Sequence, residues 1–263
     1  MKKTILLFAL SLTCMSFSQK MYVNLKTGYD FQSGSQRLGI DYNPDSKTDT
    51  AINYSLGKGF NVEGAFGYKI QEYFGVELGI SYLNGSTFET KQTFTNGNFN
   101  STTVSGKMLK IIPNIVINAG YDKINPYAKM GLIIGTNGQV NEEFNQRTSA
   151  TQTKNTILKK EGGIDIGFKT SLGVLYSVNK KISLFGEANL TSLTFTPKKG
   201  SFTKYYIDGI DKLSTLNVNS REIEYVESGT NGLPVNSNEP QKTLTRRLPF
   251  SSLGINLGIQ YNF

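Results

Sequence analysis

The last residues of the chain, Leu253-Gly254-Ile255-Asn256-Leu257-Gly258-Ile259-Gln260-Tyr261-Asn262-Phe263, alternate without interruption between apolar and small or polar side chains. Successive side chains of a β-strand point to opposite faces, so this stretch predicts a strand that is apolar along one whole face. Such a face, ending at an aromatic terminal residue, is typical of the strand that closes a transmembrane β-barrel. The C-terminal stretch therefore favours an all-β membrane protein.

Seven earlier segments repeat the same period of two, at residues 21–31, 60–70, 74–82, 109–119, 128–134, 164–176 and 182–190. A tilted strand needs about 9–11 residues to cross the hydrocarbon, and most of these segments supply that length. Pro113 interrupts the fourth segment. Because proline removes a ladder hydrogen bond, we expect a bulge there.

The connections between these segments alternate in length. They are long at 32–58, 84–106, 136–162 and 197–246, and short at 71–73, 120–125 and 177–181. Outer-membrane barrels combine tight periplasmic turns with long external loops. We therefore predict one eight-stranded antiparallel transmembrane β-barrel with short periplasmic turns, four long external loops and both termini in the periplasm. Tyrosines near the strand ends are expected in the interfacial belts, namely Tyr22, Tyr29, Tyr68, Tyr73, Tyr82, Tyr121, Tyr127, Tyr176 and Tyr261.

Residues 1–18 have the three parts of a secretory signal peptide: Lys2 and Lys3, an apolar run, and small residues at Ser16 and Ser18. We expect cleavage before Gln19, which leaves residues 19–263 as the barrel domain. Cys14 is the single cysteine. It is expected to leave with the signal, although a lipoprotein would instead carry its acyl chain there. The mature chain then has no disulfide and no thiol chemistry.

The overall charge and hydrophobicity exclude two other classes of protein. The formal charge is +8, or +6 without Lys2 and Lys3, and the basic residues form no concentrated stripe. We therefore expect no nucleic-acid partner. Only 38% of the residues are hydrophobic, and no later stretch approaches 18 consecutive apolar residues, which excludes a helical membrane protein.

If the apolar faces of the strands meet lipid, the alternate residues fill the barrel interior. The ionisable residues at those positions are Lys26, Glu63, Glu77, Lys110, Lys129, Asp165, Lys169 and Glu187. Counting from the short turns places Lys169 near Glu187, and Glu63 about four residues out of register with Glu77, with Lys26 between the two acids. This near-neutral lumen charge network is either a polar core that holds the barrel shut or a proton- or cation-selective path.

The composition removes most enzymatic chemistry. Histidine is absent, which excludes Ser-His hydrolysis and the usual zinc sites. Glu63 and Glu77 are the only acid–base pair we nominate, and their expected separation is wide for two carboxylates that act together in acid–base catalysis. We therefore predict a non-enzymatic protein without a cofactor.

The external loops carry two further patterns. Asp41, Asn43, Asp45 and Asp49 alternate as in a calcium loop, but Ser46 and Ile52 stand where that loop needs Gly and Glu, so a solvated loop is expected and a weak calcium contact is the alternative. Residues 93–100 centre on Asn96-Gly97, which predicts a hairpin extending beyond the membrane. The apolar residues of loop 197–246 predict a small ordered element, either a lid over the barrel mouth or one packed on neighbouring loops.

Three stretches carry a family resemblance: Asn125-Pro126-Tyr127-Ala128-Lys129-Met130-Gly131-Leu132, Gly167-Phe168-Lys169-Thr170-Ser171-Leu172-Gly173-Val174, and Gly258-Ile259-Gln260-Tyr261-Asn262-Phe263. Through them the whole mature chain resembles the small outer-membrane β-barrels, the OmpA N-terminal barrel, OmpX and OmpW. The resemblance implies the outer membrane of a Gram-negative bacterium, with its lipid and lipopolysaccharide as partners. Tyr261 and Phe263 are similar to the signal by which the barrel-assembly machinery recognises its clients.

The leading functional hypothesis is a non-enzymatic barrel that serves envelope integrity or surface interaction, with an unknown ligand or protein at its external loops. A narrow porin-like or OmpW-like channel for small solutes or hydrophobic molecules is the first alternative. An accessory subunit of a larger outer-membrane complex is the second. Arg246, Arg247, Lys198 and Lys199 are expected near the outer headgroups, where they either meet lipopolysaccharide phosphates or act as ordinary anchors.

Overall fold

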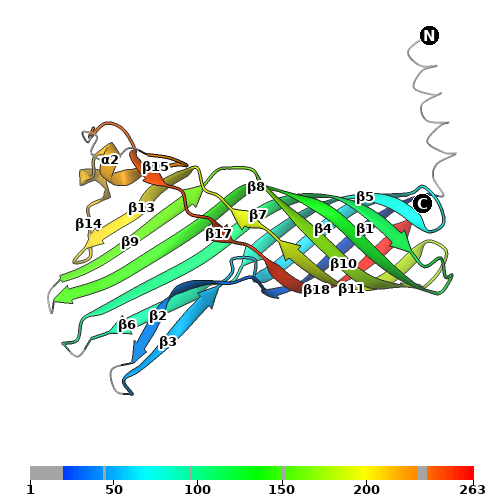
Figure 1. The fold of residues 1–263 in the computed structure, drawn as a ribbon, viewed down its shortest axis with the longest axis horizontal. Helices are drawn as coiled ribbons and strands as arrows, with labels where there is room; N and C mark the ends of the chain where they lie inside the picture. Colours follow the sequence, from blue (N-terminus) through cyan, green and yellow to red (C-terminus); the bar gives the residue numbers. More distant parts are fainter. Residues whose placement is uncertain (1–19, 44–45, 95, 150–151, 230–235) are drawn as a thin grey trace, which may run out of the picture.

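The computed structural model describes residues 20–43, 46–94, 96–149, 152–229 and 236–263, so the predicted signal peptide and Cys14 lie outside the described residues. Eight antiparallel strands close into a ring, which confirms the predicted barrel (Figure 1). In ring order they are β1 (Met21–Gln32), β4 (Gly59–Lys69), β5 (Phe74–Gly85), β7 (Phe99–Asn118), β8 (Ile124–Ser149), β10 (Asp165–Ser177), β11 (Ile182–Ser192) and β18 (Ser252–Asn262).

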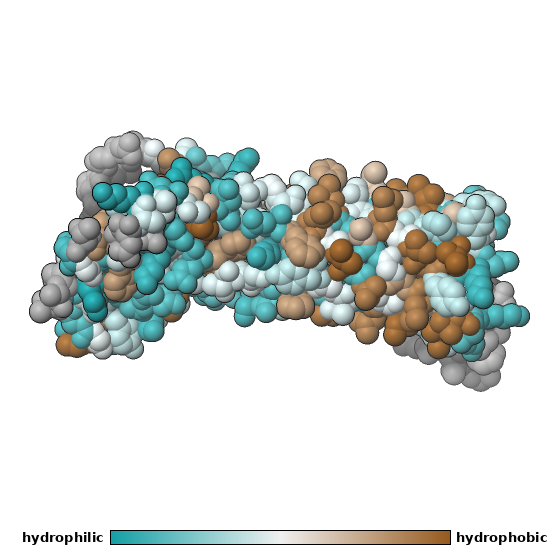
Figure 2. Space-filling view, turned by 90° about the horizontal axis from the view of Figure 1, so that it is seen from below, coloured by the Kyte–Doolittle hydropathy of each residue, from teal (hydrophilic) through white to brown (hydrophobic). Residues whose placement is uncertain are grey.

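The C-terminal strand closes the ring as its alternation predicts. Ile259 of β18 pairs with Leu25 of β1 on one side and with Leu184 of β11 on the other. Leu253, Ile255 and the other apolar residues of β18 are exposed on the outer surface. Figure 2 shows hydrophobic residues gathered over the barrel half of the molecule, while the opposite half is mostly hydrophilic. Among the described helices, none has the length and hydrophobicity needed to span a membrane.

The predicted bulge at Pro113 is wrong. Pro113 keeps its place opposite Leu78 in β5, and the register with β8 is the same before it, at Ile111 and Ile134, as after it, at Asn114 and Gly131. Only the two residue pairs between these positions are absent from the β7–β8 ladder, as expected next to a proline, which has no N–H to donate. Asn114 Nδ2 donates to the Ile112 carbonyl at 3.0 Å. The register shift in this strand lies elsewhere, between Lys107 and Leu109.

Beyond the barrel, β7 and β8 continue into an open sheet, which we call the external sheet because it lies outside the barrel (Figure 1). Its order is β3-β2-β6-β7-β8-β9-β13-β15-β16. The added strands are β2 (Gln36–Asn43), β3 (Thr48–Tyr54), β6 (Phe88–Thr93), β9 (Gln152–Glu161), β13 (Lys199–Ile207), β15 (Glu222–Val226) and β16 (Gln241–Leu244). The hairpin predicted around Asn96-Gly97 is present: Phe94 N donates to Asn98 O at 2.9 Å, and Gly97 has a φ of 79°.

The last external loop is ordered over most of its length. Its strand β13 pairs with β9, with Gly200 opposite Lys160, so the loop extends the external sheet. The short strand β14 (Ile210–Asp211), the 3₁₀ helix η2 (Leu213–Thr215) and the helix α2 (Val218–Arg221) connect β13 to β15. Near its end, β17 (Leu248–Pro249) pairs with β12 (Thr194–Phe195) at the barrel mouth. Residues 230–235 lie outside the described part.

Candidate functional site in the barrel lumen

The structure places all eight residues of the predicted lumen charge network in the barrel, each less than a tenth exposed. Six of them join in one group of ion pairs, which we call the ionic cluster: Lys26, Glu63, Glu77, Lys129, Lys169 and Glu187. Lys110 and Asp165 stand apart from it. No carboxylate of the described residues lies within ion-pair distance of Lys110, and Asp165 accepts a hydrogen bond from Thr196 N at 2.9 Å.

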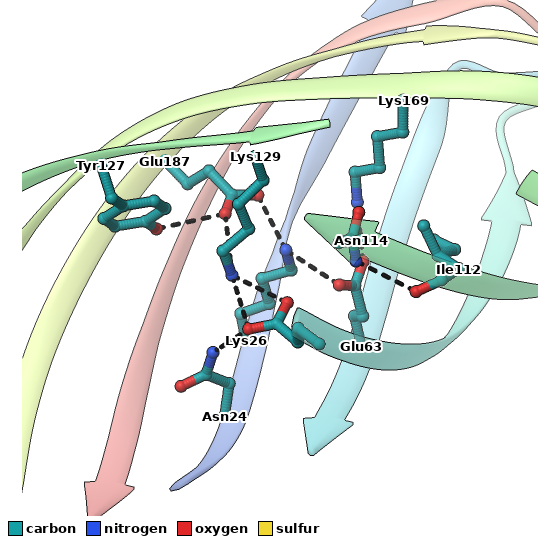
Figure 3. Close-up of polar contacts among 10 residues, drawn as sticks. Asn24, Lys26, Glu63, Ile112, Asn114, Tyr127, Lys129, Lys169 and Glu187 are labelled. Atoms are coloured by element: carbon teal, nitrogen blue, oxygen red, sulfur yellow. Dashed lines mark hydrogen bonds and ion pairs between the residues drawn. The ribbon is translucent and has the colours of Figure 1, made fainter. Parts of the chain in front are cut away.

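Lys26 and Glu63 form the centre of the ionic cluster (Figure 3). Lys26 Nζ lies 2.9 Å from Glu63 Oε1 and 2.7 Å from Glu187 Oε1. The second oxygen of Glu63 accepts from Lys169 Nζ at 2.6 Å. Lys26 and Glu63 therefore each form ion pairs with two side chains, which come from strands distant in the sequence.

Lys129 completes the ionic cluster. Its Nζ lies 2.9 Å from both oxygens of Glu77 and 3.6 Å from Glu187 Oε2. Asn24 Nδ2 donates to Glu77 Oε2 at 2.7 Å, and Tyr127 OH donates to Glu187 Oε2 at 3.1 Å. Three ammonium groups thus neutralise three carboxylates, which satisfies the requirement that buried charges be paired and hydrogen-bonded.

Two lysines have other ion-pair partners in the structure than the sequence predicted. Glu63 and Glu77 are four residues out of register, with Glu63 opposite Ser81 and Gly67 opposite Glu77, but Lys26 pairs with Glu63 and Glu187 instead of bridging Glu63 to Glu77. Lys169 pairs with Glu63 and not with Glu187, because the narrow lumen lets its long side chain reach a strand on the opposite side.

Two tyrosines assigned to the interfacial belts lie in the lumen instead. Tyr22 is 4% exposed and Tyr127 is 7% exposed. Each shares the face of its strand with a lysine of the ionic cluster, Tyr22 with Lys26 and Tyr127 with Lys129. The alternation of side chains was sufficient to find this, since position along the strand alone does not decide which face a residue occupies.

Asp30 is a lumen residue that our sequence reasoning missed. It is 2% exposed and lies on the same face of β1 as Lys26. Its Oδ1, together with side-chain atoms of the buried Asn61, Asn189, Ser252 and Asn256, has no hydrogen-bond partner within the described ranges. Its even-numbered position in the first segment, shared with Lys26, was a signal that would have identified it.

A second layer, which we call the apolar plug, fills the barrel at the end facing the external sheet. It was not predicted. The residues Leu56, Phe195 and Phe250 are at most 1% exposed and belong to a buried group that also contains Leu83, Val104, Met108, Ile112, Ile133, Val140, Leu193 and Leu248. Its three closing segments, around Leu56, Phe195 and Phe250, come from two connections between wall strands. Backbone hydrogen bonds tie them together, from Leu56 N to Pro249 O at 2.8 Å and from Phe250 N to Leu193 O at 2.9 Å. Alternation along the wall strands does not reveal this closure, because Leu56, Phe195 and Phe250 lie outside the eight wall strands.

At the other end of the barrel the lumen widens into a polar cavity of about 280 Å³. Asn24, Tyr127 and Lys129 form its inner wall, so it ends at the ionic cluster.

The calcium-like pattern of Asp41, Asn43, Asp45 and Asp49 does not form a metal site among the described residues. Asp41 Oδ1 accepts a hydrogen bond from Lys91 N at 2.6 Å, and the described residues hold no group of three or more His, Cys, Asp or Glu side chains suited to a metal ion. Asp45 lies outside the described residues.

The solved structures to which the chain is similar include that of neisserial surface protein A, with a TM-score of 0.41, 11% identity, and coverage of 92% of this chain and 97% of that chain. Another is the attachment invasion locus protein Ail of Yersinia pestis in complex with the heparin analogue sucrose octasulfate, with a TM-score of 0.32, 10% identity, and coverage of 93% of this chain and 99% of that chain. A third is CarO2 of Acinetobacter baumannii, with a TM-score of 0.34, 13% identity, and coverage of 92% of this chain and 99% of that chain. No curated protein matches the sequence.

The family model gives the assignment. The model described as the outer membrane protein beta-barrel domain matches residues 4–219, which is most of the chain. The chain therefore belongs to the outer membrane protein β-barrel domain family and is an outer-membrane protein of the Gram-negative type.

Proposed function

We propose that this protein is a non-enzymatic, non-conducting barrel that acts at the cell surface through its external sheet. The observation that carries the proposal is the double closure of the lumen, by the ionic cluster and by the apolar plug. An eight-stranded barrel leaves an interior just wide enough for side chains to fill. A solute crossing it has to displace both layers, which opposes the channel alternative.

The same contacts oppose catalysis. Glu63 and Glu77, the only acid–base pair nominated from the sequence, each accept charged hydrogen bonds from lysines at 2.6–2.9 Å. Both oxygens of each carboxylate are occupied by these lysines, so neither carboxylate is free to reach a substrate.

The external sheet provides the surface for interaction. Strand β8 has 26 residues, and only its first part, up to about Ile134, carries the alternating lipid-facing residues. Phe263 N donates to Met21 O at 3.2 Å, so the ends of β1 and β18 meet at one rim, and Asn262 N donates to Lys181 O of a short turn at that rim. Outer-membrane barrels keep short turns in the periplasm, which supports periplasmic termini and an extracellular sheet.

The lipid and assembly partners follow from the same orientation. Tyr261 and Phe263 are 40% and 51% exposed, with ring centres 5.2 Å apart. This accessible aromatic pair at the end of β18 supports recognition by the barrel-assembly machinery. Arg246 and Arg247 are exposed near the barrel mouth, which supports contact with outer headgroup phosphates.

Planar-bilayer recording of refolded residues 19–263 tests the closed lumen. A boiling-dependent shift in gel mobility verifies that the barrel has folded. We expect a folded barrel with no reproducible conductance steps. Stable single-channel steps from the folded protein would overturn the proposal and support the channel alternative.

A short-loop variant separates surface interaction from envelope integrity. Glu142 and Leu158 are register partners, so Asn-Gly replacing residues 143–157 closes the β8–β9 hairpin with a two-residue turn. In cells that lack the wild-type protein, we expect this variant to restore resistance to detergents and antibiotics but not adhesion. Loss of both properties would assign the sheet to envelope integrity. Stoichiometric co-purification of another outer-membrane protein would support the accessory-subunit alternative.

A further inference from the structure

The outward face of the external sheet carries a polar groove far from the lipid. The groove has a volume of about 340 Å³ and crosses β7, β8, β9 and β13. Register places Asn145, Asn155 and Tyr206 in one row on this face. Phe99, Arg147 and Thr153 form the neighbouring row. We call these six residues, together with Lys204, the amide groove.

The amides of the groove are held in place by one carboxylate. Asn155 Nδ2 and Asn145 Nδ2 donate to Glu143 Oε1, at 2.8 Å and 3.3 Å, and the two asparagines also contact each other. Asn155 Oδ1 is buried and accepts no hydrogen bond from the described residues. A buried polar atom without a partner is costly, so a small turn of the Asn155 amide that brings Oδ1 to a ligand hydroxyl is favourable.

Aromatic rings hold cations at both sides of the amides. Lys204 Nζ lies 5.3 Å from the centre of the Tyr206 ring, while Arg147 and Lys91 lie 5.5 Å and 6.0 Å from the Phe99 ring. A cation on a ring face is attracted by the ring quadrupole and keeps its N–H groups free at the edge. The nearby carboxylate of Asp208 is engaged by Thr153 N at 2.7 Å. Four cations, Arg147, Lys204, Lys91 and the groove-lining Lys154, outnumber the two carboxylates of Glu143 and Asp208, so the charge around the groove is net positive.

We propose that the amide groove binds an acidic polysaccharide, in which carboxylates meet Arg147 and Lys204 and hydroxyls meet the asparagine row. The inference rests on the proposed surface function and names its ligand class. Asn145 lies 11 positions beyond Ile134, the last exposed apolar residue of β8, or roughly 35 Å along the strand at 3.3 Å per residue. A barrel strand tilts by about 45°, so the groove stands roughly 25 Å above the lipid-facing band, which favours a polysaccharide over a lipid headgroup.

Binding of folded residues 19–263 in detergent to immobilised polygalacturonate tests the proposal, with neutral dextran and inorganic polyphosphate as comparison surfaces. We expect polygalacturonate to bind most tightly. The double variant Arg147→Gln/Lys204→Gln should weaken that binding at least about tenfold, because it removes two charged hydrogen-bond donors. The Asn155→Leu variant, which keeps the charge, should also weaken it. The matched control Lys180→Gln/Lys242→Gln removes the same charge from exposed sites elsewhere and should stay within about twofold.

Three results would overturn the inference: no binding to polygalacturonate, equal losses in the test and control variants, or tighter binding to polyphosphate that Asn155→Leu leaves unchanged. The last would reduce the groove to a non-specific basic surface. A silent barrel that does not bind polygalacturonate rejects this inference and leaves the proposed function intact. A conducting barrel that binds polygalacturonate rejects the closed lumen and leaves the groove intact.

Discussion

Lys169 Nζ reaches across the full width of the barrel to Glu63 Oε2, at 2.6 Å. Lys169 lies on β10 and Glu63 on β4, and four steps separate these strands in either direction around the ring of eight. The pair therefore ties opposite walls together, in contrast to Lys26 and Glu63, which lie directly opposite each other on neighbouring strands. Both side chains of the cross-lumen pair are less than a tenth exposed.

Replacing Glu63 by Gln should destabilise the barrel strongly, because it leaves the buried Lys169 without a carboxylate partner and leaves Lys26 paired with Glu187 alone. Breaking a buried ion pair in this way costs about 3–5 kcal/mol. The free energy of unfolding from urea titration, followed by circular dichroism and gel mobility, checks the loss. The partly exposed pair of Lys159 and Glu161 provides the control, and Glu161→Gln should change stability by less than about 1 kcal/mol. An equal effect of the two variants would contradict a structural role for the ionic cluster.

Opening the lumen should require both layers to be removed. Phe195 and Phe250 pack edge to face, with ring centres 5.7 Å apart, and Phe195→Ala/Phe250→Ala removes the middle of the apolar plug. We expect this variant to lose several kcal/mol of stability, about 3–5 for each ring, yet to remain silent in planar bilayers. Conductance should appear only when Lys26→Ser and Glu187→Ser are added. Conductance from the phenylalanine variant alone would show that the ionic cluster is no barrier.

Two glycines of the barrel wall should respond oppositely to alanine. A Cβ at Gly173 would lie 2.3 Å from Tyr127 Cζ, so Gly173→Ala displaces the ring that donates to Glu187. We expect a loss of about 1–3 kcal/mol, as for other overpacked sites. A Cβ at Gly64 meets no atom within 4 Å, and Gly64→Ala should be neutral or stabilise by up to about 1 kcal/mol. Thermal shifts of gel mobility measure both, and the same sign for both would contradict the packing.

The external sheet should loosen in alkali through Tyr225. Burial is the main reason that the pKa of Tyr225 is raised to about 12, and the charge of Glu142 adds to the effect. The unfolded phenol has a pKa of about 10, so the neutral form stabilises the fold fully below that pH. This contribution is lost as pH rises from about 10 to about 12. Limited proteolysis between pH 8 and 12 should show accelerating cleavage near β15, and Tyr225→Phe should delay it. An unchanged profile would contradict the assignment.

Much of the barrel could be predicted because its information is local. Period-two alternation identified all eight wall strands, and the order of long and short connections identified which rim carries the extensions. The same alternation placed the eight lumen charges inside and, applied strictly, would have placed Asp30, Tyr22 and Tyr127 there too. Each of these conclusions needs only the rule that neighbouring side chains of a strand face opposite ways.

The sequence by itself thus determined the fold class, the number of wall strands and the polar nature of the lumen. Only the tertiary structure decided which charges pair, because Lys169 and Glu63 are separated by 106 residues and meet only when the ring closes with its particular shear. It also decided that Leu56, Phe195 and Phe250 close the barrel mouth, and that loop 197–246 continues the external sheet. Those contacts depend on distant segments reaching the same place, and no periodicity within one segment encodes where another segment ends.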